Sequence, residues 1–362
     1  MTRTTASPYM EWAKTRSAAR FNLSRSGVPD QPLAAIGASL DDVETSGGGD
    51  GYGWTPLLET IARRFGTSPD CVVHLPGTSM ANFVALAGLL SPGDDVVAES
   101  PTYELIVSAA RFLGANVVPF IRRPEDEFRV DPEDVARAVT PRTRLVALTN
   151  LHNPSSALIP DDTLFRVGTI AREAGARVLV DEVYLEALYE TPPRTAHRLG
   201  PEFVVTSSLT KAYGLSGLRC GWVLAERDVA RRLWRLNDLF GANHARPAET
   251  LALRAFAKLD ALAPGFNQML ETNRDRLHAF LRTRADLACY VPPQGTVVFP
   301  KLLTGEVGRL CSRLREAYET TVVPGEYFGR PAHFRVGLSV ETDTFREGLA
   351  RLGQALDDLA KG

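Results

Sequence analysis

From residue 55 to residue 239, short runs of β-branched and apolar residues alternate with segments whose apolar residues recur at the helical period. This alternation is typical of βα units, in which parallel strands pair side by side and the connecting helices cover the sheet. The pattern therefore predicts an α/β fold with a doubly wound, mainly parallel central sheet flanked by helices. The expected strands are 71–75, 95–99, 116–120, 144–149, 177–181, 203–207 and 218–224, and the expected helices are 55–65, 79–90, 102–113, 132–139, 162–174 and 227–239.

A different pattern begins after about residue 243, where long helices and short, scattered strands replace the alternation. The elements expected outside the large sheet are helices 9–19, 248–258, 265–284 and 344–359, and short strands near Tyr290 and at 297–299 and 334–339. We therefore expect a large domain of residues 45–245. A smaller α+β domain is expected from residues 1–44 and 246–362, and a chain of 362 residues is long enough for both.

Composition and charge exclude several functional classes. A net charge of −2 gives no positive field for a nucleic-acid backbone or an anionic membrane, so neither is an expected partner. No run of about 18 apolar residues is present, so no membrane span is expected. The N-terminus lacks the apolar core of a signal peptide, which favours a cytoplasmic location. The cysteines Cys71, Cys220, Cys289 and Cys311 form no Cys-x-x-Cys pair and indicate reduced thiols rather than zinc ligands or disulfides.

The densest group of chemically active residues is the segment 207–222, SSLTKAYGLSGLRCGW. It follows an expected strand and contains three glycines. It also places Ser208 three residues before Lys211 and Arg219 eight residues after it. A Ser-x-x-Lys sequence alone is more often a surface lysine in a loop. The rest of the array favours a functional lysine.

This array resembles the cofactor-lysine signature of the class I/II, fold type I aminotransferases, which use pyridoxal 5′-phosphate (PLP), and the resemblance extends over most of the chain. It implies that Lys211 carries PLP as a Schiff base and that Ser208 and Arg219 hold the cofactor phosphate. A lysine amine with a pKa of about 10.4 is a poor nucleophile at neutral pH. Once the substrate has displaced it from the Schiff base, the amine can act as the proton-transfer base. The phosphate carries about 1.5 to 2 negative charges and therefore needs hydroxyl donors and a cation.

The apolar run 177–181 ends in Asp181, at the edge of the sheet where ligands bind in open α/β folds. By itself an aspartate at a strand end is more often a helix cap or a turn residue, but its spacing to Lys211 favours a functional role. The resemblance implies that Asp181 keeps the pyridine nitrogen of PLP protonated, which strengthens the ring as an electron sink. It also implies that Tyr184 hydrogen-bonds the ring oxygen.

Residues 149–156, TNLHNPSS, resemble the family's Asn-Pro-Thr/Ser-Gly turn. The resemblance implies that Asn153 also contacts the ring oxygen of PLP and belongs to the substrate-binding residues. Ser156 stands where relatives have a glycine. An Asn-Pro pair alone is only a turn signal, and His152 is expected to be structural rather than catalytic.

Residues 75–82, LPGTSMAN, lie between an expected strand and an expected helix, where backbone N–H groups form an anion site. The segment resembles the family's phosphate-binding turn. The implied phosphate contacts are Thr78, Ser79 and the backbone of Met80, and Ser79 caps the helix at the same time. Tyr103 matches the family's aromatic residue that stacks on the pyridine ring.

Two matches concern a partner subunit and the substrate. Tyr52 resembles the tyrosine that reaches across a dimer to the neighbour's cofactor phosphate, so the resemblance implies a homodimer. Arg335, in residues 333–339 (HFRVGLS), resembles the arginine that binds the substrate α-carboxylate, a bidentate contact suited to a guanidinium. Arg330 is the weaker alternative for this contact.

The substrate side-chain pocket is expected to come from three loop segments, 22–30, 240–246 and 292–296. The family's glycine-containing N-terminal loop can be matched on any of three residues, Ser24, Ser26 and Gly27. The residues that could meet a polar or acidic substrate tail are Asn243, His244 and Arg246. Placement on a loop surface fits these last residues equally well.

The implied reaction is transfer of the amino group of an amino acid to a 2-oxo acid. Other PLP reactions of an amino acid remain open: carbon–sulfur β/γ-elimination, decarboxylation, cyclisation and oxidation. They share these motifs because the branch is set by which substrate bond the pocket holds perpendicular to the ring. A sensor domain of aminotransferase type would carry a basic helix-turn-helix segment, and none remains here. The tract 47–53 lacks the Gly-Lys-Ser/Thr of a nucleotide-binding loop and predicts a plain loop.

Overall fold

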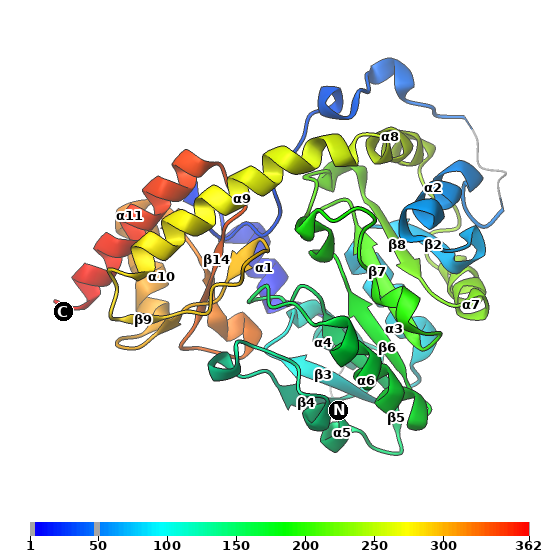
Figure 1. Cartoon of the computed structure of the whole chain (residues 1–362), viewed down its shortest axis with the longest axis horizontal. Coiled ribbons are helices and arrows are strands. Elements are labelled where there is room, and N and C mark those ends of the chain that lie inside the picture. Colours follow the sequence, from blue (N-terminus) through cyan, green and yellow to red (C-terminus); the bar gives the residue numbers. More distant parts are fainter. Residues whose placement is uncertain (1–3, 47–50, 362) are drawn as a thin grey trace.

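The computed structural model describes residues 4–46 and 51–361, and a single large sheet forms its centre (Figure 1). The strands of this sheet are β2 (Val72–Pro76), β3 (Asp95–Ser100), β4 (Asn116–Ile121), β5 (Thr143–Thr149), β6 (Arg177–Asp181), β7 (Phe203–Ser208) and β8 (Cys220–Leu224). The seven strands lie in the order β2-β8-β7-β6-β5-β3-β4. All neighbours are parallel except β8, which runs antiparallel to β2 and β7. The mainly parallel sheet that the alternation predicts is therefore confirmed.

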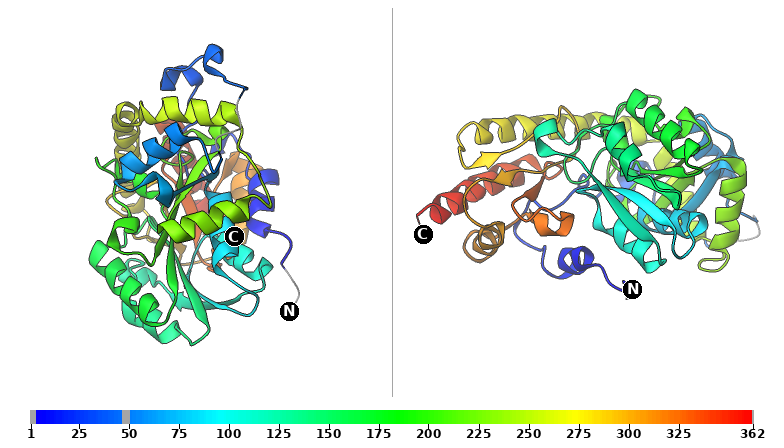
Figure 2. Two further views of the ribbon diagram at one scale, coloured as in Figure 1. Left: turned by 90° about the vertical axis from the view of Figure 1, so that its right-hand side faces the viewer. Right: turned by 90° about the horizontal axis from the view of Figure 1, so that it is seen from below.

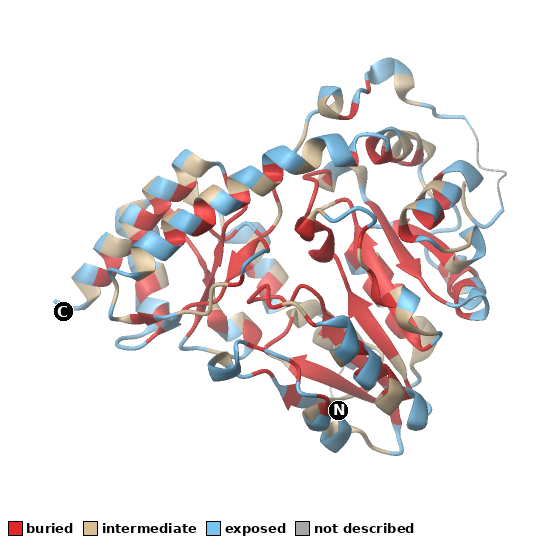
Figure 3. Cartoon of the chain, viewed as in Figure 1, coloured by how far each residue is buried: buried red, intermediate tan, exposed pale blue. Residues whose placement is uncertain are grey.

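Helices lie on both sides of this sheet (Figure 2). They are α2 (Thr55–Phe65), α3 (Thr78–Leu89), α4 (Glu104–Phe112), α5 (Pro132–Ala138), α6 (Asp161–Glu173) and α7 (Arg227–Asn237). Helix α3 packs on β2, β7 and β8 and also contacts α4 and α7, whereas α5 packs beside α6. The strands are largely buried except for the edge strand β4, and many of the exposed residues lie on the outer faces of the helices (Figure 3).

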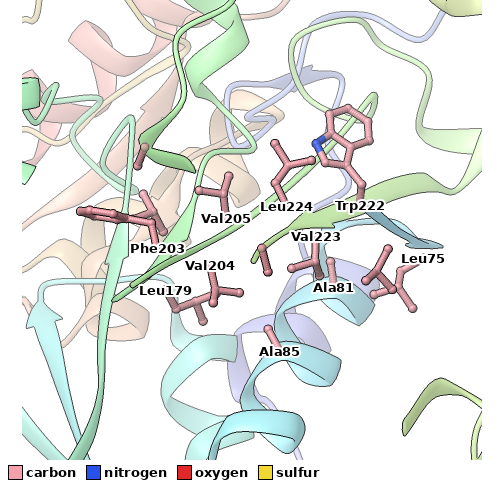
Figure 4. Close-up of a cluster of buried hydrophobic side chains, with 14 of the residues drawn as sticks. Leu75, Ala81, Ala85, Leu179, Phe203, Val204, Val205, Trp222, Val223 and Leu224 are labelled. Carbon is pink, nitrogen blue, oxygen red and sulfur yellow. The ribbon is translucent and has the colours of Figure 1, made fainter. Parts of the chain in front are cut away.

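Small residues let α3 approach the sheet closely. Ala81 and Ala85 are fully buried and face Val204 and Val223 of the central strands (Figure 4). Full burial of a valine side chain contributes about 1.5–3 kcal/mol relative to an exposed one. This core therefore fixes the start of α3 against the carboxyl ends of β6 and β7, where polar side chains gather.

The remaining residues form a second unit with a hydrophobic core of its own, which includes Leu23, Phe334 and Phe345. Its elements are α9 (Leu259–Leu281), β9 (Leu287–Ala288), β10 (Val297–Val298), β11 (Lys301–Leu302), α10 (Val307–Tyr318), β12 (Thr320–Thr321), β13 (Val323–Pro324), β14 (Phe334–Gly337) and α11 (Thr342–Leu359). Helix α8 (Arg246–Phe256) precedes them and packs on α2 and β8 of the large unit. The N-terminal arm joins this unit because β1 (Phe21–Asn22) pairs with β12. Helix α9 extends from α8, beside the large sheet, to the small unit (Figure 1).

Several predicted boundaries are wrong. Helix α1 (Pro8–Thr15) is shorter than the predicted 9–19, because Arg16 already leaves the helical conformation. Strand β8 begins at Cys220 rather than at residue 218, because Arg219 adopts a left-handed conformation (φ 49°) after a short turn. Helix α9 begins at Leu259 rather than at residue 265. It continues through Pro264, although this proline lacks the N–H that would bond the preceding turn.

Two further elements differ from the predictions. The strand expected near Tyr290 lies instead at Leu287–Ala288. Helix α10 adds to the predicted elements, although its buried residues Val307, Leu310 and Leu314 recur at helical spacing. Residues 47–50 of the predicted glycine-rich loop lie outside the described residues. In the described ranges, none of the helices combines the length and the hydrophobicity needed to cross a membrane.

Candidate active site

A cavity of about 640 Å³ lies at the carboxyl ends of β5, β6 and β7, under helix α1. The predicted site residues that line it are Thr78, Ser79, Tyr103, Asn153, Asp181, Tyr184, Ser208, Lys211 and Arg219. These residues come from segments more than a hundred positions apart in the chain. The structure therefore brings most of the predicted site together in one place.

Lys211 lies in the turn between β7 and β8, against the N-terminal arm. Its Nζ donates a hydrogen bond to Ser26 Oγ (3.2 Å), which also accepts one from the Tyr184 hydroxyl (2.9 Å). Gly27 packs so closely here that a Cβ would lie 3.0 Å from Lys211 Cδ. Burial lowers the pKa of the Lys211 amine, and the positive charge of Arg335 lowers it further. The amine thus lies beside the Ser26 hydroxyl, and it binds its proton less tightly than the amine of a free lysine does.

Asp181 is the last residue of β6 and is almost completely buried. One carboxylate oxygen accepts a hydrogen bond from Asn82 Nδ2 (2.7 Å) and the other accepts one from the Val183 amide (3.0 Å). Thr206 in turn donates to Asn82 Oδ1 (2.5 Å), which fixes the direction of the Asn82 amide. Burial raises the pKa of Asp181 to about 6 in spite of these donors. A cationic group at the cavity floor would stabilise the ionised carboxylate.

The opposite end of the cavity has the character of an anion site. Helix α3 starts after Gly77, which makes no side-chain cap, so the first amides of the helix are left for a ligand. Thr78 Oγ1 donates to Ser208 Oγ (2.7 Å) beside them. The Arg219 guanidinium donates to the carbonyl of Pro76 (3.1 Å) and lies over Gly77, where a Cβ would come within 2.2 Å of it. Amides, hydroxyls and a guanidinium therefore surround one small volume.

Arg335 of β14 is fully buried next to the cavity. Its Nη1 donates to Asn153 Oδ1 (2.8 Å), and its Nη2 donates to the Tyr9 hydroxyl and to the Ser24 carbonyl (both 3.1 Å). Its buried Nε has no hydrogen-bond partner among the described residues. A buried guanidinium with a vacant donor is suited to a carboxylate ligand.

Other predicted residues lie elsewhere. Tyr52 is half-exposed, packs on Trp234 and donates to Asp238 Oδ2 (3.3 Å) rather than reaching the cavity of its own chain. Met80 follows in the first turn of α3 and does not line the cavity. The buried His152 contacts Ser155 and the Pro101 carbonyl and also stays outside the cavity.

Of the three segments expected to form the side-chain pocket, only residues 22–30 contribute to the cavity, through Ser26. Residues 240–246 and 292–296 do not line this cavity. His244 packs on the ring of His74 (4.6 Å) and Arg246 lies over Trp54 (4.6 Å), which holds their loop against the large unit. Gly295 instead accommodates Ser156, which keeps the left-handed backbone (φ 58°) of the glycine it replaces.

Comparison with known proteins agrees with this geometry. Residues 22–352 match the family model of aminotransferase class I and II. The chain is 30% identical to capreomycidine synthase from Streptomyces vinaceus, over 99% of this chain and 95% of that protein.

The chain belongs to the aminotransferase class I and II family.

Two further proteins extend the comparison within the aminotransferase class I and II family. The chain is 30% identical to arginine–pyruvate transaminase from Pseudomonas aeruginosa, over 97% of this chain and 94% of that protein. The fold matches a crystal structure of a PLP-dependent aminotransferase from Streptococcus suis with a TM-score of 0.91, at 24% identity and over 99% of both chains. The predictions of fold type I, of an aminotransferase class I/II enzyme and of PLP as cofactor are thus confirmed.

The residues of this aminotransferase cavity fit PLP. The cofactor needs an amine for its aldehyde, a carboxylate for its ring nitrogen and an anion site for its phosphate. Lys211, Asp181 and the group around Arg219 line the same cavity and offer these three features. Burial raises the pKa of Asp181 to about 6, and a protonated ring nitrogen beside it would favour its ionised form.

Structural contacts add residues to which the sequence motifs assign no role. Tyr9 and Met10 of α1 line the cavity, as does Thr149 at the end of β5. Asn82 lies behind Asp181, outside the cavity. Asn82 lies in the segment that resembles the phosphate-binding turn, but nothing in the sequence indicates that it bonds Asp181. Tyr9 has no sequence signal, because only the fold brings α1 to Arg335.

Proposed function

We propose that this enzyme transfers the amino group of an amino acid to a 2-oxo acid, with Lys211 as the catalytic amine. PLP, when bound, supplies an aldehyde carbon for the exchange of amino groups and a ring that withdraws electrons from the substrate Cα. Lys211 Nζ takes the proton from the substrate Cα and later returns it. Its position next to Ser26 and Tyr184, and its lowered pKa, support this role.

Asp181 is proposed to hold the ring nitrogen of PLP in its protonated form. Asn153 and Tyr184 are proposed to bind the ring oxygen, and Tyr103 to stack on the ring face. The support is that all four line the cavity and that Asn82 fixes the orientation of the Asp181 carboxylate. A fixed carboxylate needs no reorganisation when charge develops in the transition state.

The cofactor phosphate is proposed to lie at the start of α3. Its proposed contacts are Thr78, Ser79, the backbone of Met80, Ser208 and Arg219. The uncapped helix start and the closely placed glycines 77 and 221 support this assignment, because a Cβ on Gly221 would lie 2.6 Å from Gly77 Cα. Only a backbone without side chains leaves room for an anion at this turn.

Arg335 is proposed to bind the substrate α-carboxylate, with Asn153 beside it. The vacant Nε donor and the contact with Asn153 support this role. Arg330, the alternative from the sequence, instead has its Nη2 directed at the Ser100 carbonyl (3.5 Å).

A homodimer is also proposed, in which Tyr52 reaches the cofactor phosphate of the neighbouring subunit. Support comes from the exposed apolar residues Tyr52, Leu239 and Phe240, which lie close together through Trp234 and Asp238. Sedimentation of the purified protein should give a dimer at assay concentrations. A monomer that retains full activity would contradict this proposal.

We also propose the domain division and the location that the sequence predicts. The pairing of β1 with β12 supports one small domain from residues 1–44 and 246–362, next to a large domain of residues 45–245. Four free cysteines support a reducing, cytoplasmic location.

The test of the function is a half-reaction. The holoenzyme is mixed with single amino acids and no acceptor, beginning with arginine because one relative is named for that substrate. We expect the visible band to disappear with release of one equivalent of 2-oxo acid per site, and pyruvate or another 2-oxo acid to restore the band. Continuous release of ammonia, thiol or carbon dioxide would instead indicate a lyase or a decarboxylase.

Cyclisation is the second candidate, because the relative matched over 99% of this chain is a capreomycidine synthase. A cyclase needs no amino acceptor. Steady formation of a product with the mass of a dehydrated or otherwise cyclised amino acid, without any 2-oxo acid, would favour this candidate over transamination.

A further inference from the structure

A line of buried polar side chains crosses the carboxyl ends of three neighbouring strands and ends at the cavity. Arg122, just after β4, donates to Glu99 Oε2 at the end of β3 (2.7 Å). The other oxygen of Glu99 accepts from the Thr149 amide (2.7 Å) and from the Thr149 hydroxyl (2.5 Å) at the end of β5. All three side chains are at least 98% buried. The motifs of the sequence contain neither Arg122 nor Glu99.

The hydrogen bonds along this line have a fixed direction. The Thr149 hydroxyl has one hydrogen, and it donates this hydrogen in a hydrogen bond to the Glu99 carboxylate. The hydroxyl lone pair is then left to accept the backbone N–H of Asn153 (3.0 Å). Asn153 Oδ1 accepts in turn from Arg335 Nη1 (2.8 Å). Each group therefore determines whether the next group donates or accepts the hydrogen bond between them.

We propose that Thr149, oriented by the buried Arg122–Glu99 pair, is a positioning residue that sets Asn153 and, through it, Arg335 for the substrate α-carboxylate. The inference rests on the proposed role of Arg335. Thr149 does not act on the reacting atoms; it fixes the backbone that carries Asn153. This series of hydrogen bonds from Glu99 through Thr149 and Asn153 to Arg335, the relay, connects the end of β5 to β14. Arg335 is the residue proposed to contact the substrate.

The burial of the ion pair supports a role beyond packing. A buried pair contributes little net stability compared with apolar residues of the same size, because both charges lose their hydration. Here only Thr149 separates the Arg122–Glu99 pair from the cavity, because Thr149 bonds Glu99 and itself lines the cavity. A purely structural role would make Thr149 important for folding but not for recognition of a carboxylate.

Two small probes separate these roles without knowledge of the natural substrate. Aminooxyacetate and O-methylhydroxylamine both react with the Lys211-linked cofactor through the same aminooxy group, but only the first carries a carboxylate. The ratio of their second-order rate constants, followed as loss of the visible band of the holoenzyme, measures recognition of the carboxylate. Arg335→Lys should lower this ratio about 100-fold, because a bidentate charge-assisted contact is lost.

For Thr149→Val we expect the ratio to fall about tenfold, because the hydroxyl that donates to Glu99 and accepts from the Asn153 amide is removed without a change of shape. Thr149→Ser keeps the hydroxyl and should stay within threefold of wild type. Thr102→Val is the matched control: the Thr102 hydroxyl donates to the same Glu99 oxygen (3.3 Å) but is not linked to Asn153. Its ratio should stay within twofold. The thermal midpoint of each variant is measured alongside.

A wild-type ratio in Thr149→Val would overturn the relay, whatever the thermal midpoint. An equal fall in Thr102→Val would overturn it as well, since the effect would then come from a general disturbance of Glu99. Should Thr149→Val not fold, Thr149→Ala carries the same expectation. A wild-type protein that does not prefer aminooxyacetate would contradict the proposed role of Arg335 itself, and a wild type without a visible band would contradict the assignment of Lys211.

Discussion

Replacing Lys211 by alanine should abolish the visible band and lower the rate of amino-group transfer by a factor on the order of 10⁴ or more. The side chain has two proposed tasks, the covalent link to the cofactor and the transfer of the substrate Cα proton. Ser26 holds the amine from one side, and Tyr184 donates to Ser26, but neither can replace the amine, because a neutral serine or tyrosine hydroxyl binds a proton far too weakly to act as the base.

The measurement combines the absorption spectrum of the variant after incubation with PLP and the half-reaction described above. Lys301→Ala, at an exposed lysine on β11, is the control and should behave as wild type. Retention of the band in Lys211→Ala would show that another amine holds the cofactor and would contradict the proposed site.

Replacing Asp181 by asparagine should reduce the rate of the half-reaction by about 10²–10³-fold, while the variant still binds PLP. The amide has the same shape, and it can still accept a hydrogen bond from Asn82, but it cannot hold a proton on the ring nitrogen through charge. The ring then withdraws electrons less strongly from the substrate Cα. An unchanged rate would contradict the proposed role of Asp181.

The affinity of the apoenzyme for PLP should also show the ionisation of Asp181. Burial raises the pKa of this carboxyl to about 6, so it is ionised above pH 6 and progressively neutral below it. Since the ionised form is the one that pairs with a protonated ring nitrogen, affinity should fall as the pH drops below about 6 in the wild type. Titrations of Asp181→Asn in parallel remove the contributions of the phosphate and of Lys211. If the two proteins show the same pH dependence, Asp181 does not pair with the ring.

The parts of the site that the sequence predicts are those carried by short contiguous motifs. Lys211, Ser208 and Arg219 lie in one segment, and Asp181 ends an apolar run. In a parallel sheet the carboxyl ends of all strands meet at one edge, so placing these motifs after strands is sufficient to bring them together.

The contacts that the sequence does not predict are made between distant segments. Tyr9 meets Arg335 across 326 positions, and Ser26 meets Lys211 across 185. Glu99 and Thr149 are neighbours only because β3 pairs with β5. No local spacing or propensity encodes such pairings, since they depend on strand order and on how the two units pack.

The residues of the pocket for the substrate side chain also could not be predicted from local sequence. Residues 240–246 contain polar side chains suited to a substrate tail, and the sequence offered no reason to prefer burial for them. In the structure, His244 packs edge to face against His74 and Arg246 lies over Trp54, so the aromatic partners that hold this loop come from elsewhere in the chain.

The strap formed by residues 26–31 has a consequence for how the enzyme matures. Val28 N–H bonds to the Lys211 carbonyl (2.9 Å), Gln31 N–H bonds to the Gly214 carbonyl (2.9 Å), and Gly214 lies against Pro29. These residues leave the ribosome early, but their partners emerge about 180 residues later. The lysine turn can reach its final form only after the earliest-made segment has returned to it. The turn that carries the proposed cofactor lysine can therefore form only in a chain that has been made at least as far as Gly214.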